Sequence, residues 1–440
     1  MIAVRLQTPE KIRDLQRGLY LKAKREPKFR FYLLHDKVWR EDILRHAYRL
    51  ERSNGGAPGI DGVTFRSIEG GEGEAEFLSR LRQELKEKTY RPQAVRRVYI
   101  PKADGKLRPL GIPTIRDRVA QMAVKIVIEP IFEADFEGCS FGFRPRRDAH
   151  QAVGAIREAL SSGHPYVFDG DLSRYFDTIP HNKLLEVVAS RISDRHILAW
   201  IKQWLKAVVV EEDEQGTRRT LGGKKVKRGT PQGGVISPLL ANIYLHLFDR
   251  AFLAYCRVTG LAAHLVRYAD DFVILMRGGV NQSLEKVKQI LGGMELKLNG
   301  EKSRMVDARE EGFDFLGFSS CRRRNRQTGR VEPSRKSQQR FRDEVRRLTE
   351  RFSHHQPERE VLDRVNRYVR GWVNYFHLHN STQAFQRQRF FLEQRMRKYL
   401  QKRRQIKGFG YRRWPAARLY KEFGLCAIPL YAPYRRTRMP

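Results

Sequence analysis

The sequence predicts a body of interleaved strands and helices, of the α/β or α+β class, followed by an all-helical domain. Up to about residue 320, short β-branched apolar runs alternate with segments whose apolar residues recur at helical spacing. From about 334 to 404 only the helical spacing occurs, among many arginines. These patterns divide the chain into an N-terminal extension over 1–95, a central unit over 96–325, a helical domain over 326–404 and a short basic tail over 405–440.

The elements of the first half follow from local patterns. Residues 1–50 are basic with helical spacing, and 51–64 form a loop dense in turn formers. Segment 73–90 has the apolar spacing of a helix, and 96–113 predicts two strands joined by an Asp-Gly turn. Two further helices are expected over 115–136 and 151–163.

The second half contains the segments expected to form the central strands, 166–172 and 265–275, because both are short and strongly apolar. Between them, 227–256 passes from a Gly/Pro loop into a long apolar helix. After them, 280–306 predicts a helix followed by a strand.

The charge of the chain points to a polyanionic partner. Lys and Arg number 86 against 50 Asp and Glu, a formal net charge of +36 over 440 residues. Such a field suits nucleic acid, with an anionic membrane surface as the alternative. No apolar run reaches the ~18 residues that span a bilayer, and we expect no membrane partner. The four cysteines are widely separated, which argues against a zinc module or a disulfide scaffold and fits a reducing, cytoplasmic setting.

Adjacent carboxylates interrupt the apolar segment LVRYADDFVIL, where Asp270 and Asp271 lie between two runs typical of buried strands. A bare Asp-Asp pair usually occupies a solvated turn, because ionised carboxylates are costly to bury and repel one another. Here a third candidate, Asp171, follows the apolar strand YVFDG. If the two strands are neighbours, the three carboxylates can converge, and such a group favours divalent cations, above all Mg²⁺.

Several ordered stretches carry a resemblance to reverse transcriptases, and most of all to the group II intron-encoded reverse transcriptase and maturase proteins. The resemblance implies the α+β class: a right-hand-like fingers and palm, with an antiparallel sheet and helices, followed by an all-α thumb or maturase domain. It covers about residues 51 to 435. The stretches are GGAPGIDGVT, DGKLRPLGIPTIRDRVAQ, SFGFRPRRDAHQAV, VFDGDLSRYFDTIPH, RGTPQGGVISPLLANIYL, YADDFVIL, LNGEKSRMV, FDFLGF, VNRYVRGWVNYF and GFGYRRWPAARLYKEFGL.

The resemblance implies roles for individual residues. It makes Asp171, Asp270 and Asp271 metal ligands, with the Leu172 carbonyl as a further backbone ligand, whereas Asp169 and Asp177 fall off the ligand positions. Phe176 corresponds to a gate against the 2′-hydroxyl, although it could instead be a core aromatic beside Tyr175. The remaining site residues are Lys102 and Arg108 on the triphosphate, assisted by Arg96, Gln232 at the sugar and Lys302 at the leaving pyrophosphate. Exposed hairpin charges often serve solubility alone, and Arg144, Arg146 and Arg147 are expected to contact template or primer phosphates.

The implied function is RNA-directed DNA synthesis by two-metal phosphoryl transfer, joined to a maturase that assists splicing and retrohoming. The expected cofactors are two Mg²⁺ ions, with Mn²⁺ as a substitute, and the substrates are deoxynucleoside triphosphates. The expected partners are group II intron RNA, an RNA template and a DNA or RNA primer. The oligomeric state is left open, a monomer on RNA being one form. The tail offers no paired cysteines or histidine-rich site, so no endonuclease is expected.

Two alternatives remain open from the sequence. One is a domesticated reverse transcriptase of the same type, acting in phage defence or beside a CRISPR system. The other is an RNA-binding splicing cofactor with no polymerase role.

Overall fold

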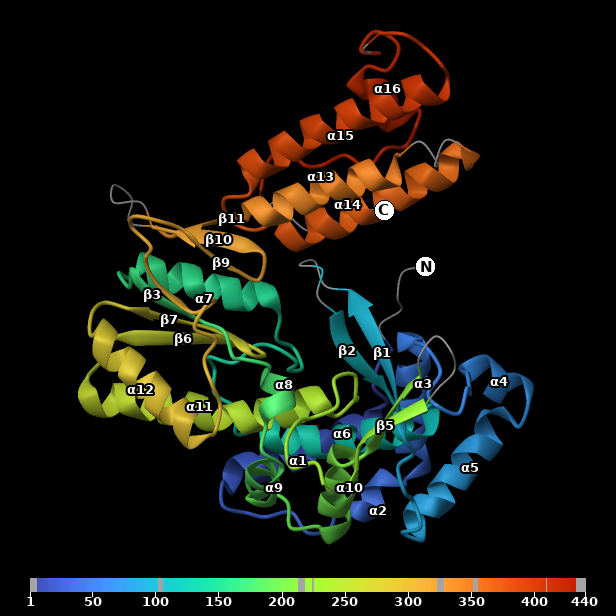
Figure 1. Cartoon of the computed structure of the whole chain (residues 1–440), viewed down its shortest axis with the longest axis vertical. Coiled ribbons are helices and arrows are strands. Elements are labelled where there is room, and N and C mark those ends of the chain that lie inside the picture. The colour runs from blue at the N-terminus through green and yellow to red at the C-terminus, as the bar shows by residue number, and fades with distance from the viewer. Residues whose placement is uncertain are drawn as a thin grey trace.

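The structure is a computed structural model that describes residues 6–101, 105, 107–212, 218–223, 225–322, 328–350, 355–408 and 410–432. Its elements confirm the predicted α+β class: helices and strands are mixed through most of the chain, and helices dominate its C-terminal part (Figure 1). The predicted division between residues 325 and 326 lies outside the described residues. Within the described ranges, no helix is both long and apolar enough to cross a bilayer.

The long helix α6 (Ile115–Glu133) organises the N-terminal region. It is buried on nearly all sides, as expected of a helix that is apolar all round. Helix α5 ends at Lys86, earlier than the predicted 90, because Lys88 takes a left-handed φ of +67°. The helices α1, α2 and α3 pack against α6, and α4 packs on α5. Their bounds are α1 Glu10–Arg25, α2 His35–Val38, α3 Glu41–Asn54, α4 Phe65–Gly70 and α5 Gly73–Lys86.

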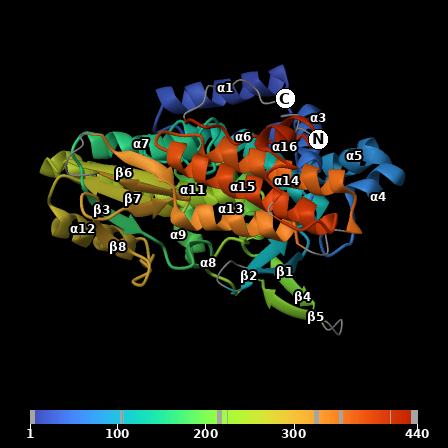
Figure 2. The same cartoon turned by 90° about the horizontal axis from the view of Figure 1, so that it is seen from above.

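A first sheet, the N-terminal sheet, contains the predicted hairpin. Strands β1 and β2 pair in antiparallel fashion, with Ile100 opposite Arg108 near the tip. A second hairpin, β4–β5, was not predicted and joins the sheet through a parallel pairing of β4 with β1. Figure 2 shows this second hairpin on the side of the molecule opposite α1. The sheet order is β2-β1-β4-β5, with β1 Val95–Pro101, β2 Leu107–Ile112, β4 Val208–Glu212 and β5 Arg218–Gly222.

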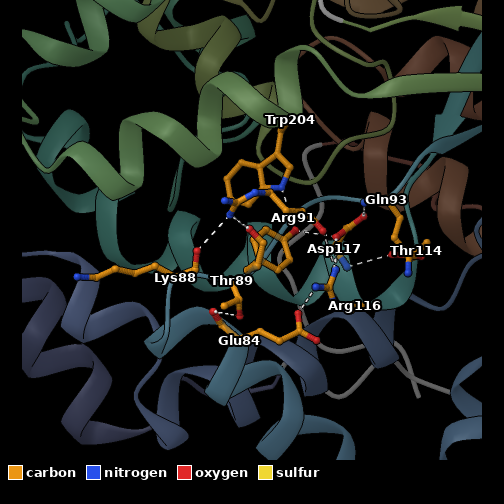
Figure 3. A network of polar contacts seen from close by, with 10 residues as sticks. Glu84, Lys88, Thr89, Arg91, Gln93, Thr114, Arg116, Asp117 and Trp204 are labelled. Carbon is orange, nitrogen blue, oxygen red and sulfur yellow. Dashed lines mark hydrogen bonds and ion pairs between the residues drawn. The ribbon is translucent and has the colours of Figure 1, made fainter.

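A buried polar network anchors the base of this sheet. The Tyr90 hydroxyl donates to Asp117 at 2.7 Å and accepts from the Trp204 indole at 3.0 Å. The second oxygen of Asp117 accepts from the backbone N–H of Gln93 at 2.8 Å. The network therefore ties the chain leading into β1 to the start of α6 and to the end of α10 (Arg195–Leu205), as Figure 3 shows. Burial raises the pKa of Asp117 despite these donors.

The central sheet has the order β6-β7-β3-β8, and every pair of neighbours is antiparallel. Helix α7 covers one face, and α11 and α12 lie on the other (Figure 1). The strands are β3 Tyr166–Gly170, β6 Ala263–Tyr268, β7 Asp271–Met276 and β8 Arg304–Asp307. The helices of this region are α7 Ala149–Ser161, α8 Tyr175–Thr178, α9 His181–Ala189, α11 Ser237–Thr259 and α12 Val280–Gly293.

The C-terminal helical domain has its own apolar core. A small antiparallel sheet, β11-β10-β9, lies between this domain and the central sheet (Figure 1). Trp414, Leu419 and Ile428 are fully buried in the domain's core, so the described part of the predicted tail packs with these helices. The elements are β9 Phe313–Phe315, β10 Phe318–Cys321, β11 Arg330–Pro333, α13 Arg335–Leu348, α14 Glu358–Phe376, α15 Thr382–Arg403 and α16 Ala416–Lys421.

Candidate active site

The paired aspartates lie on the tight turn between β6 and β7. Tyr268 pairs with Asp271, so Ala269 and Asp270 form the two residues of the turn. Ala269 has a φ of +58°, in the left-handed region that residues with a Cβ seldom adopt. We call Ala269 and Asp270, with the adjoining Asp271, the catalytic turn.

A buried ion pair holds this turn in place. The Arg267 guanidinium donates to both oxygens of Asp249, at 2.8 and 2.5 Å, and both side chains are fully buried. Its remaining nitrogen donates to the Asn242 side-chain oxygen at 3.0 Å and to the Ala269 carbonyl at 2.9 Å. Burial opposes the charge on Arg267, but Asp249 outweighs it, so the pKa of the guanidinium is raised. We call Arg267, Asp249 and Asn242 the arginine clamp.

The loop before α7 completes the support of the turn. The Asn242 amide donates to the Gly142 carbonyl at 2.7 Å. A Cβ on Gly142 would lie 2.3 Å from the Ala269 nitrogen, so only glycine fits there. The Phe141 N–H donates to the Arg267 carbonyl, and the Arg267 N–H donates to the Cys139 carbonyl.

The third carboxylate lies at the same end of the sheet. Gly170, the last residue of β3, is opposite Phe272, so Asp171 follows directly beside the catalytic turn. The Asp171 backbone donates to the Ser303 hydroxyl at 3.1 Å and accepts from the Asn299 N–H at 2.8 Å. The end of β3 therefore lies beside the turn that carries Asp270 and Asp271.

The carboxylates repel one another. Part of Asp271 faces solvent, yet the surrounding protein, followed by the charges of Asp270 and Asp171, raises the pKa of its carboxyl to about 6. Burial, followed in smaller part by Asp171, also raises the pKa of Asp270. The Lys302 ammonium lies 2.9 Å from an Asp171 oxygen and neutralises one of the charges. Among the described residues, no three acidic, imidazole or thiol side chains converge tightly enough to hold a metal by themselves.

The donor chemistry of this site nevertheless fits Mg²⁺. That ion prefers oxygen ligands and binds through one or two carboxylates, with waters or substrate phosphates filling its other positions. Leu172, the predicted backbone ligand, forms an isolated antiparallel β-bridge with Leu298. The hydrogen bonds of this bridge use Asp171 and Ser173, on either side of Leu172.

A relay of polar side chains connects the N-terminal sheet to α8. The Arg108 guanidinium donates to the Gln232 side-chain oxygen at 3.1 Å, and the Gln232 amide donates to Asp177 at 3.1 Å. A cation on one side and an anion on the other fix the orientation of this amide. The Gln232 carbonyl accepts from the Gly111 N–H at 2.5 Å, and Gly233 has a φ of +108° that suits glycine. The relay brings two predicted site residues together and gives Asp177 a part that the sequence did not suggest.

Phe176 packs beside Tyr175, as the alternative expectation of a core aromatic has it, and its role as a sugar gate stays a prediction. Its ring is half-buried, packs against the main core and meets Tyr175 edge to face at 5.6 Å between centroids. Its carbonyl accepts from the Thr230 N–H at 2.7 Å, which joins α8 to the loop that carries Gln232. The unburied part of the ring remains available to a ligand.

The other predicted basic residues differ in their outcome. Lys102 lies outside the described residues. Arg96 pairs with Ile112, four residue pairs from Arg108 along the hairpin and thus about 13 Å away, and its assistance to Arg108 stays a prediction. The expectation for Arg144 is wrong: its side chain is buried, paired with Glu133 at 2.6 Å and bonded to the Ser140 carbonyl at 2.8 Å. It braces the loop before α7 and cannot reach a phosphate.

Sequence reasoning missed the arginine clamp. A signal was present, because Arg267 is a charged residue inside an apolar strand and such a charge needs a partner. The partner itself, on α11, has no local signature.

Two family models match the chain. The model described as "Reverse transcriptase (RNA-dependent DNA polymerase)" matches residues 100–320, and "Group II intron, maturase-specific domain" matches 338–420. Protein YkfC of Escherichia coli (strain K12) is 36% identical over 352 residues, which is 72% of this chain and 90% of that protein. The group II intron-encoded protein LtrA of Lactococcus lactis subsp. cremoris is 39% identical over 224 residues, 51% of this chain but only 35% of LtrA. The putative COX1/OXI3 intron 2 protein of Saccharomyces cerevisiae is 30% identical, over 63% of this chain and 37% of its own length.

The arginine clamp predicts a specific pattern of stability. Arg267→Met leaves Asp249 buried and uncompensated, which should cost about 3–5 kcal/mol of unfolding free energy in urea titrations. Arg267→Met/Asp249→Leu removes both charges and should recover most of that loss. Arg347→Met is the matched control, since the Arg347–Glu344 pair is also two-pronged, at 2.6 and 2.8 Å, but exposed. It should cost less than about 1 kcal/mol, and equal losses from the buried and exposed pairs would contradict the stabilising role of the clamp.

Proposed function

The chain belongs to the group II intron family of reverse transcriptases and maturases and is an RNA-directed DNA polymerase, and we propose that its chemistry takes place at the catalytic turn. The observation that carries this proposal is the group of mutually repelling carboxylates, in which the pKa of Asp271 is raised to about 6. Such a group is stabilised by cations, and nucleotidyl transfer requires them.

The proposed metal ligands are Asp171, Asp270 and Asp271, with the Leu172 carbonyl as a backbone oxygen, for two Mg²⁺ ions or for Mn²⁺ in their place. The ions would supply activation of the primer 3′-hydroxyl and stabilisation of the leaving pyrophosphate. The arginine clamp would orient Asp270 and Asp271 toward the reacting atoms. Arg267 donates to the carbonyl of Ala269, the residue between β6 and Asp270, and so holds the start of the turn. Lys302, paired with Asp171, would neutralise the pyrophosphate as it leaves.

The incoming deoxynucleoside triphosphate would lie between the catalytic turn and the polar relay. Arg108 and Lys102 would hold its phosphates, since a guanidinium can pair in a fork with phosphate oxygens. Gln232 would touch the sugar, held in orientation by Asp177. The exposed part of the Phe176 ring would exclude a 2′-hydroxyl. Burial raises the pKa of Asp270, and the charge of Arg108 acts in the opposite direction, which supports a position of Arg108 near the catalytic turn.

The helical domain would bind intron RNA and assist splicing and retrohoming. Folded RNA is recognised largely through its shape, phosphates and 2′-hydroxyls, which suits a broad basic surface. Helices α13 to α15 supply such a surface, because their cations are exposed while their aromatic side chains are mainly in the core. The exposed cations are Arg335, Lys336, Arg340, Arg346, Arg347, Arg359, Arg367, Arg370, Arg387, Lys398 and Lys402.

The polymerase assignment predicts that Asp270→Asn and Asp271→Asn each reduce extension of a DNA primer on an RNA template with Mg²⁺. The expected loss is at least about 100-fold, the usual cost of removing one group that stabilises transition-state charge. Asp36→Asn, an exposed carboxylate on α2, should extend normally. Equal extension by wild type and both active-site variants would show that the polymerase assignment is wrong.

The sugar gate predicts that Phe176→Ala accepts ribonucleotides. Because the ring would occupy the space of one hydroxyl, discrimination between dNTP and rNTP should fall by at least about 10-fold, as for one small group in a tight pocket. The measurement is the ratio of kcat/KM values for the two sugars. Phe390→Ala, which removes an exposed aromatic from α15, should leave the ratio unchanged. If selectivity is unchanged in Phe176→Ala, Phe176 has a purely structural role.

The maturase proposal predicts that the protein accelerates splicing of the intron RNA around its reading frame at low Mg²⁺. Arg335→Gln/Lys336→Gln/Arg340→Gln should weaken RNA binding and lower the salt slope by about 0.7–0.9 for each phosphate that the protein no longer neutralises. Asp270→Asn is the control, since it should stop polymerisation and leave splicing intact. Failure of the wild type to accelerate splicing would favour a domesticated polymerase.

A further inference from the structure

Phe143 is an exposed aromatic residue in a strained conformation beside the catalytic turn. It has a φ of +56°, and 49% of its surface is exposed. Loops usually place glycine or asparagine in the left-handed region, because a bulky side chain is disfavoured there. Neither burial of the ring nor backbone preference explains a phenylalanine at this position, and strain of this kind tends to occur at functional sites.

The backbone on both sides of Phe143 is anchored in the protein interior. Gly142 packs against the Ala269 nitrogen and accepts a hydrogen bond from Asn242 at 2.7 Å. The Arg144 side chain is only 3% exposed and is paired with Glu133. The ring therefore projects from a rigid base, and its Cα lies one residue, about 3.8 Å, from the glycine that touches the catalytic turn.

We infer that Phe143 is a nucleic acid contact whose ring stacks on the terminal nucleotide of the primer. The inference rests on the proposed polymerase function, which requires the primer 3′ end to lie at Asp270 and Asp271. The surrounding charge suits a phosphate backbone: Arg146 is exposed, and Arg147 lies over the Phe141 ring at 5.3 Å. An aromatic ring can stack on any base, so this contact would hold the primer terminus without reading its sequence.

Substitution of Phe143 separates a binding role from a structural one. Phe143→Ala should weaken binding of a fluorescein-labelled primer–template by about 5-fold to 150-fold, the range for removal of one base–aromatic stack. Phe143→Gly should bind as weakly, but its Tm should equal or exceed that of wild type, because glycine relieves the left-handed backbone. Phe143→Trp should restore binding. A purely structural Phe143 would give the opposite pattern, with a lower Tm and unchanged affinity in the folded fraction.

Lys88→Gly is the matched control, since Lys88 is also exposed and left-handed, with a φ of +67°, but lies after α5. It should gain the same backbone relief and keep wild-type primer affinity. If wild type extends primers while Phe143→Ala and Phe143→Gly bind them normally, the inference is overturned and the polymerase assignment stands. If wild type fails to extend any primer, the proposed function itself is at fault.

The strand can be identified by photocrosslinking. The substitution Phe143→4-benzoylphenylalanine should crosslink to the last nucleotide of the primer in a complex with an RNA template and Mg²⁺. A crosslink confined to the template strand, or to nucleotides far from the primer end, would overturn the assignment to the primer terminus.

Discussion

The buried ion pair between Arg267 and Asp249 is the interaction on which the geometry of the candidate active site depends. A guanidinium without solvent is tolerable only when its donors are satisfied, and here they bond to Asp249, Asn242 and the Ala269 carbonyl. Two of these partners, Asp249 and Asn242, lie on the long helix α11, and the third is in the turn that carries the aspartates. The clamp therefore connects the two-residue turn to α11 through buried hydrogen bonds.

Two features of the candidate site are unfavourable for folding, namely its repelling carboxylates and its left-handed residues. Four acidic side chains lie close enough to influence one another, and the pKa values of both Asp169 and Asp271 are raised to about 6, chiefly because the surrounding protein displaces water from the carboxyl groups. Ala269 is held in the left-handed region, and so is Phe143 on the adjoining loop. Natural proteins tolerate such violations of local preference where function requires them and compensate elsewhere. Here the compensation comes from the clamp, from Lys302 beside Asp171, and from the large apolar core beneath the sheet.

The N-terminal sheet reaches the site through side chains. Arg108 lies on β2, Gln232 on a loop before α11 and Asp177 on α8, and two hydrogen bonds join the three. A relay of this kind exchanges partners more readily than a packed core does, because its members are largely exposed. In this the relay differs from the arginine clamp, whose ion pair is fully buried.

The sequence by itself determined what depends on neighbouring residues. Apolar runs predicted β3 and the β6–β7 hairpin, the Asp-Gly turn predicted β1 and β2, and the resemblance of ordered motifs indicated the α+β polymerase fold with its three aspartates. Only the tertiary structure decided what depends on distant residues. It paired Arg267 with Asp249, placed β4 beside β1, and buried Arg144 although its sequence context suggested a phosphate contact. The physical reason is that a strand or turn is specified by local backbone and apolar patterns, whereas the partner of a buried charge is specified by packing between segments far apart in the chain.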